Sequence, residues 1–190
     1  YNDGNGDKSG HVRVYEYNGT TWEQLGADID GEASGDKSGF SVSMNSTGKI
    51  VAIGGHQNDG NGDDSGHVRV LEYNEETSQW EQLGVDLDGE ASGDLSGFNV
   101  SINSDGTMVA IGAIRNDGNG NNSGHVRVYE KVTLQSLIDA AYGVGIDFYF
   151  EGLASTFALT EAIEFLDVDF QSSTLEDIPH VEITLTDPQR

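Results

Sequence analysis

The sequence Asn58-Asp-Gly-Asn-Gly-Asp-Asp-Ser-Gly-His-Val-Arg-Val70 occurs three times in this chain with few changes. Near-copies start at Asn2 (NDGNGDKSGHVRV) and at Asn116 (NDGNGNNSGHVRV), so the period is 56 and then 58 residues. Each copy is a polar, glycine-rich loop that runs directly into a segment of alternating residues. Three copies of one loop and strand in 190 residues indicate a repeat protein.

Each repeat contains four segments with the pattern of a short strand. In the best-defined copy they are Ser38–Met44, Ile50–Ile53, His67–Tyr73 and Trp80–Leu83. Alternation with a period of two, interrupted by Gly, Asn and Asp turns, predicts antiparallel strands. The second segment is apolar on both faces, as expected for a strand between two neighbouring sheets. Four strands per repeat favour a β-propeller blade, and a β-solenoid is the alternative.

A shorter motif recurs twice in every repeat. It reads Asp or Asn, any residue, Ser-Gly, and His or Phe. The five copies begin at Asp7, Asp36, Asp63, Asp94 and Asn121. This second periodicity predicts that each repeat is built from two related hairpins.

The segments 38–55 (SGFSVSMNSTGKIVAIGG) and 96–113 (SGFNVSINSDGTMVAIGA), each followed by an SGHVRV strand, resemble FG-GAP repeats. Such repeats are the blades of the integrin-α-type β-propeller. The resemblance covers residues 1–130 and implies a seven-bladed ring, an extracellular or cell-surface location and a role in adhesion. Two features depart from the family: the proline of its Gly-Ala-Pro triplet is missing, and its calcium loop is reduced to Asn45-Ser-Thr-Gly48 and Asn103-Ser-Asp-Gly106.

The expected fold class is therefore an all-β repeat of four-stranded blades, followed by a small α+β module. Repeats fall near 2–57 and 58–115, with a partial one at 116–130, and the module occupies 131–190. In the module, helical spacing predicts helices at 132–141 and 159–166, and alternation predicts strands at 146–150 and 180–186. So few blades predict an open arc with uncovered flanks, either in a fragment of a longer protein or in a chain covered by neighbouring copies.

The chain is strongly acidic, with 33 Asp and Glu against 9 Lys and Arg and a formal net charge of −24. Such a surface repels nucleic acid and anionic lipid and attracts cations. No apolar run approaches the ~18–20 residues that span a bilayer, so we expect no membrane insertion. There is no cysteine, which excludes disulfides and thiolate metal sites.

Two sets of acidic and amide side chains are candidate Ca²⁺ ligands, because Ca²⁺ takes six to eight oxygens from carboxylates and carbonyls. The loop set is Asp3, Asn5, Asp7, Asp59, Asn61, Asp63, Asp117 and Asn119. The segment set, between repeats, is Asp28, Asp30, Glu32, Asp36, Asp86, Asp88, Glu90 and Asp94. The alternatives are turn chemistry for the first set and a solvated acidic rim for the second. The loop lacks the acid that an EF-hand has at its twelfth position, which here is Val70.

Other recurring residues are expected to be structural. The histidines His11, His67 and His125 repeat together with Arg13, Arg69 and Arg127, which predicts a ladder that binds the adjacent acidic segment. Trp22 and Trp80 are expected to pack, with sugar binding as the alternative. Among the N-glycosylation sequons, Asn18 and Asn45 lie at predicted turn tips and are the best acceptors, whereas Asn99 lies inside a predicted strand.

These observations favour a non-enzymatic extracellular module for adhesion, recognition or structural assembly, with calcium as a candidate modulator. The expected partners are other protein chains or surface glycans, and self-assembly is expected as well. One alternative is a subunit of an extracellular filament or surface layer. The alternative from another class is a propeller hydrolase or lyase that acts on polysaccharide, but residues 1–130 hold no unique cluster of carboxylates or histidines that breaks the repeat.

Overall fold

A computed structural model describes residues 3–132. Within this range the chain forms antiparallel β-structure and no helix, which confirms the all-β prediction. The described residues 3–131 belong to one compact unit. The helices and strands predicted for the α+β module lie outside the described residues, apart from the first residue of the first helix.

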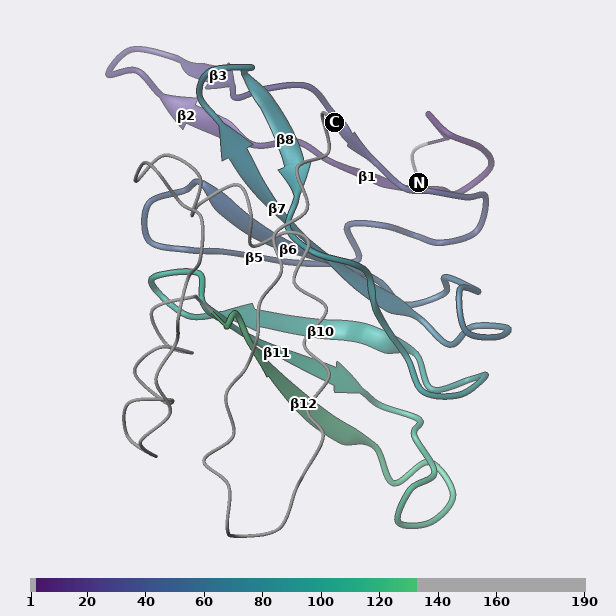
Figure 1. The fold of residues 1–190 in the computed structure, drawn as a ribbon. Helices are drawn as coiled ribbons and strands as arrows, with labels where there is room; N and C mark the ends of the chain where they lie inside the picture. The colour runs from purple at the N-terminus through teal and green to yellow at the C-terminus, as the bar shows by residue number, and fades with distance from the viewer. Residues whose placement is uncertain (1–2, 133–190) are drawn as a thin grey trace, which may run out of the picture. The chain divides into compact units, whose positions relative to one another are not determined.

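The middle sheet is the most complete one. Its strands are β5 (Ser41–Met44), β6 (Ile50–Gly55), β7 (His67–Asn74) and β8 (Gln79–Gln82), hydrogen-bonded in that order (Figure 1). These four strands match the four predicted segments to within a few residues. A fifth strand was not predicted: the two-residue β9 (Leu87–Asp88) pairs with the start of β7.

The flanking sheets repeat parts of the same pattern. On one side β10 (Ser96–Ile102), β11 (Met108–Ala113) and β12 (His125–Glu130) form a three-stranded sheet. On the other side β1 (His11–Val12) pairs with β4 (Ile29–Asp30), and β2 (Tyr15–Tyr17) pairs with β3 (Trp22–Gln24). The register is conserved from sheet to sheet, because Gly55 faces His67 in the middle sheet and Ala113 faces His125 in the next.

Two apolar clusters join the sheets, and β6 contributes to both. Val51 and Ile53 belong to a cluster with residues of the first repeat, namely Val12, Val14 and Ile29, together with Leu71 of β7. Ile50 and Ala52, on the opposite face of β6, belong to a second cluster with Val68, Ile102, Val109 and Ile111. The strand that is apolar on both faces is therefore buried on both faces, as its sequence predicts.

The outer faces of the sheets stay exposed within the described residues. Phe40, Val42 and Met44, on β5 and just before it, are 40–50% exposed, whereas their counterparts on β10 are half-buried or buried. Serines face the neighbouring sheet instead: Ser41 Oγ donates to the Gly97 carbonyl at 2.7 Å. The alternation predicted for β5 is thus present, and on its apolar side Phe40 contacts Phe98 of the next sheet, whereas Val42 and Met44 stay 40–45% exposed.

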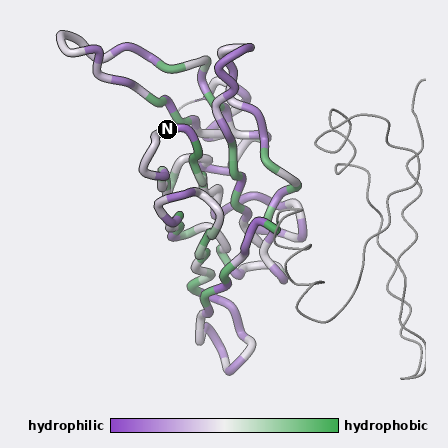
Figure 2. The backbone as a smooth tube through the Cα atoms, turned by 60° about the vertical axis from the view of Figure 1, so that its left-hand side comes forward, coloured by the Kyte–Doolittle hydropathy of each residue, from purple (hydrophilic) through white to green (hydrophobic). Residues whose placement is uncertain are grey.

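The short motif that occurs twice per repeat has a conformational basis. In all five copies its second residue has a left-handed backbone, with φ between 51° and 56°, at Lys8, Lys37, Asp64, Leu95 and Asn122. The two copies of a repeat lie side by side, since the Lys37 amide donates to the Lys8 carbonyl and the Leu95 amide to the Asp64 carbonyl. Hydrophilic residues concentrate in these loops and apolar residues in the strands (Figure 2).

Candidate functional site

The NDGNG loops and the segments between repeats meet at one side of the sheets, which we call the acidic loop edge (right side of Figure 1). It comprises residues 3–10, 58–66 and 116–124 together with 28–36 and 86–94. Amide side chains join its two parts: Asn5 Nδ2 donates to the carbonyls of Gly31 and Glu32, and Asn61 Nδ2 donates to those of Gly89 and Glu90, at 2.8–3.1 Å.

The first aspartate of each NDGNG loop closes its own turn. Its Oδ1 accepts a hydrogen bond from the left-handed residue five positions later, at 2.8 Å for Asp3, 2.8 Å for Asp59 and 2.6 Å for Asp117. The Asx contacts of the turn alternative come from Asn58 and Asn116, whose Oδ1 atoms accept from the amides of Gly60 and Gly118. All eight candidate ligands of the loops are exposed, and Asp7 forms an ion pair with Lys8 at 3.1 Å.

The candidate ligands between repeats separate into buried and exposed groups. Asp36 and Asp94 are each only 3% exposed. Asn58 donates to the Asp36 carboxylate at 3.2 Å, and Asn116 donates to the Asp94 carboxylate at 2.9 Å. Each of these aspartates therefore binds the asparagine that opens the next NDGNG loop, and the repeats are interlocked along the chain. The remaining candidates of this set are exposed or half-buried.

The His and Arg residues of the third strand contact the acidic segment of the preceding repeat, as the ladder interpretation predicts. His67 Nδ1 lies 3.8 Å from Glu32 Oε2, and Arg69 Nη1 lies 3.7 Å from Glu32 Oε1. Glu90 holds the equivalent position for His125, at 3.5 Å, and for Arg127.

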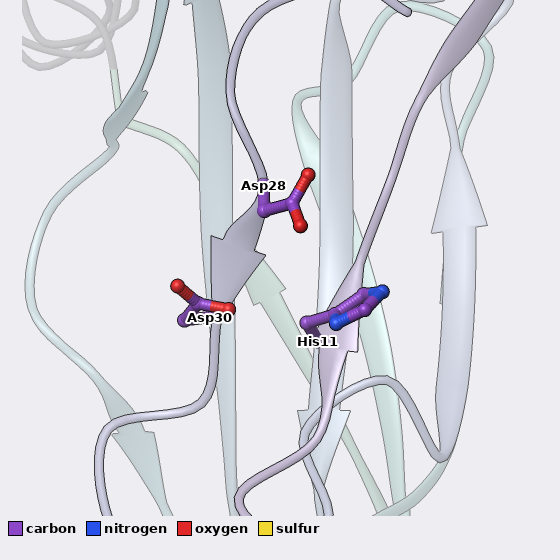
Figure 3. A group of neighbouring side chains, drawn as sticks. All are labelled: His11, Asp28 and Asp30. Atoms are coloured by element: carbon purple, nitrogen blue, oxygen red, sulfur yellow. The ribbon is translucent and has the colours of Figure 1, made fainter. Parts of the chain in front are cut away.

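The first repeat makes a different ionic contact. Arg13 donates to both carboxylate oxygens of Asp28, at 2.8 and 2.6 Å. The hydrogen bonds from Arg13 and Gln24 lower the pKa of Asp28 to about 2, and the same contact raises the pKa of Arg13. His11, Asp28 and Asp30 lie together here, with one ligand atom from each within 4.8 Å of the others (Figure 3).

A second group with metal-ligand spacing combines Glu32, His67 and Asp86, again within 4.8 Å. Among the described residues, both groups with metal-ligand spacing contain a histidine. Neither group contains a residue of an NDGNG loop. The expectation from sequence grouped carboxylates by their position in one segment and treated the histidines only as structural. Sheet register brings His67 next to Glu32 and Asp86, and the sequence signal for this was the recurrence of His-x-Arg beside the acidic segments.

The two tryptophans and the two favoured sequons occupy contrasting environments. Trp80 is half-buried and its indole nitrogen donates to the Leu25 carbonyl at 2.8 Å, whereas Trp22 is 69% exposed. Asn18 lies at an exposed turn between β2 and β3. Asn45 is 8% exposed, and its Oδ1 accepts from the amides of Lys49 and Ile50, so only Asn18 of this pair presents an accessible side chain.

Comparison with known families identifies one part of the chain. Residues 85–129 match the family described as FG-GAP repeat, which confirms the resemblance for the segment 96–113. No curated protein matches the chain. Residues 3–132 contain no helix long and apolar enough to cross a membrane. The matched range runs from the segment before β9 to the last residues of β12, so the sheet β10–β12 with its preceding acidic segment is similar to an FG-GAP repeat.

Proposed function

We propose that the chain is a non-enzymatic adhesion or recognition module built from β-propeller-type blades, acting outside the cell or at its surface. The FG-GAP match at residues 85–129 supports this class of protein. The observation that carries the proposal is the stacking of successive sheets through two apolar clusters, which presents the same acidic loop at one edge in every repeat.

The acidic loop edge suits a recognition surface. The middle loop follows β6, a strand buried on both faces, and loops on a rigid scaffold commonly carry binding residues. The exposed carboxylates of Asp3, Asp7, Asp59, Asp63 and Asp117 repeat along this edge. A partner with a basic surface, or a surface glycan bridged by a cation such as Ca²⁺, is the chemistry that complements it.

Self-assembly is the second part of the proposal. Val126 and Val128 on β12 are 68% and 60% exposed, although the equivalent Val68 is fully buried against the next sheet. A hollow of about 570 Å³ lies on this part of the molecule, lined by β10, β11 and β12. Further repeats or neighbouring copies would cover such a face, and head-to-tail contacts of this kind generate rings or filaments.

The recognition proposal is tested by binding of the 190-residue chain to arrays of extracellular proteins and glycans at low and high salt. The double variant Asp7→Asn/Asp63→Asn copies Asn121 of the third repeat, so it removes charge with a residue the repeat already tolerates. We expect salt-sensitive binding that this variant weakens and that the control Glu76→Gln, in the turn between β7 and β8, leaves unchanged. Absence of binding to every surface would contradict the proposal.

Solution size tests the assembly proposal separately. Light scattering should reveal species larger than one chain that increase with concentration. A monomer at every concentration contradicts self-assembly and leaves recognition by the loop edge standing. Melting with and without EDTA tests the calcium proposal, because a cation bound only by the native state raises the melting temperature; an unchanged midpoint would remove calcium from it.

A further inference from the structure

His67, at the start of β7 beside the acidic loop edge, has a deeply buried titratable side chain. Its side chain is 1% exposed, and neither ring nitrogen forms a hydrogen bond. A buried polar group without a partner costs free energy, so such a group calls for a physical explanation.

The two ring nitrogens of His67 have different surroundings. Gly55 pairs with His67 across β6 and β7 and lies against the Nε2 side of the ring. A Cβ at position 55 would come within 2.9 Å of Nε2, so glycine permits this close packing. Nδ1 points the other way, 3.8 Å from Glu32 Oε2 and 3.7 Å from Asp86 Oδ2.

Each carboxylate has one oxygen facing another polar side chain and one facing His67. Glu32 Oε1 lies 3.7 Å from Arg69 Nη1, and Asp86 Oδ1 accepts a hydrogen bond from Gln82 at 2.7 Å. The remaining oxygen of each faces Nδ1. Neighbours that fix the orientation of ligands in this way are typical of metal sites, where they raise affinity.

We propose that Glu32, His67 and Asp86 bind one divalent transition-metal cation of the Zn²⁺ type, which joins the first repeat to the second. One imidazole nitrogen and two carboxylate oxygens suit Zn²⁺, with water as the fourth ligand. Bonds of about 2.0–2.2 Å place tetrahedral ligands about 3.3–3.5 Å apart. The two carboxylates lie 3.7 and 3.8 Å from Nδ1, and all three ligand atoms lie within 4.8 Å of one another, so the partly exposed carboxylates would move closer to bind the ion.

The nitrogen ligand distinguishes this site from a calcium site, since Ca²⁺ prefers oxygen ligands. The chain also offers two incomplete copies. In the first repeat, Arg13 already neutralises Asp28, the counterpart of Asp86. In the third repeat, His125 and Glu90 are present, but the described residues include no counterpart of Asp86. We therefore expect one strong site per chain.

The test uses the 190-residue chain without an affinity tag, stripped with EDTA and titrated calorimetrically with Zn²⁺ and, separately, with Ca²⁺. One Zn²⁺ per chain should bind, and Ca²⁺ should not compete for it. Glu32→Gln and Asp86→Asn should each weaken Zn²⁺ binding by at least about tenfold. Glu90→Gln is the matched control, because Glu90 makes the same His and Arg contacts in the next repeat. This variant should leave the affinity for Zn²⁺ unchanged.

Two further readouts keep the test independent of folding defects. Circular dichroism checks that each variant retains the β-structure of the native chain. Nitrogen NMR of the histidines should show Nδ1 of a single ring shifting with Zn²⁺, and His67→Gln should remove that signal. The proposal is overturned by no binding, by several equivalent weak sites, or by Zn²⁺ affinity that is the same in Glu32→Gln and Glu90→Gln.

Discussion

The first and second repeats place the same residues in different surroundings. Trp80 packs against the first repeat and donates to Leu25, whereas the equivalent Trp22 is mainly exposed. Arg69 reaches the Asp30 carbonyl at 2.6 Å and Glu32, both from the preceding repeat. Arg13, at the same position in the first repeat, pairs with Asp28 of its own repeat instead.

Arg69 and Trp80 of the second repeat therefore both contact the repeat that precedes them. The second repeat buries its apolar residues against its neighbours, and its His67 and Arg69 face the preceding acidic segment. The first repeat pairs its arginine locally, with Asp28, and leaves Trp22 mainly in water. Substitutions at equivalent positions should therefore have unequal effects, and the inequality should be greatest where one residue of a pair is buried between two sheets.

The largest difference is expected between Val68 and Val126. Val68 is fully buried between two sheets, and Val126 is 68% exposed. Val68→Ala should lower the free energy of unfolding by about 2 kcal/mol through lost burial and a residual cavity. Val126→Ala should change it by less than about 0.5 kcal/mol. Urea denaturation measures both, and equal losses would mean that the outer face of β12 is covered in solution.

The interlock between Asp36 and Asn58 should contribute the next largest effect. Asn58→Ala removes a donor from a buried carboxylate and should cost about 1.5 kcal/mol. A double-mutant cycle with Asp36→Ala should give a coupling energy above about 0.5 kcal/mol, and the pair Asp94 and Asn116 should give a similar value. Additive effects in both pairs would show that the repeats are not joined through these contacts.

A pH effect should distinguish His56 from the equivalent Ile114. Burial, with a smaller effect of the Lys37 charge, lowers the pKa of His56 below its usual 6.5. Between the two values the unfolded chain binds more protons, so the stability present above pH 6.5 is lost as the pH falls below it. His56→Ile, which copies the third repeat, should reduce the loss of stability between about pH 7.5 and about pH 5.5. If His56→Ile left the pH dependence of stability unchanged, the lowered pKa of His56 would not be its cause.

The smallest effect is expected for the exposed pair of Arg13 and Asp28. The pKa of Asp28 is about 2, below its ordinary 3.8, so the contribution of this pair is present above pH 3.8 and is lost as the pH falls toward 2. Asp28→Asn should slightly flatten the acid limb of the stability curve. High salt should weaken the difference from the native chain, since the pair is solvent-exposed.

The sequence was sufficient to predict the four main strands and the burial of Ile50–Ile53, because alternation and turn residues are local signals. It did not reveal β9, a two-residue strand whose pairing with β7 depends on register between distant segments. It also did not distinguish Trp22 from Trp80, since their difference lies in whether another repeat packs beside them. The grouping of His67 with Glu32 and Asp86 was missed for the same reason: it combines two repeats.

Hydrogen exchange in the 190-residue chain tests most directly whether interior and end repeats differ as described. The segments 67–72 (HVRVLE) and 125–130 (HVRVYE) have nearly the same sequence, so their intrinsic exchange rates are matched. β7 pairs with β6, β8 and β9, whereas β12 pairs with β11 alone among the described strands. We predict that amides of β7 exchange markedly more slowly than those of β12. Equal protection of the two strands would contradict the account.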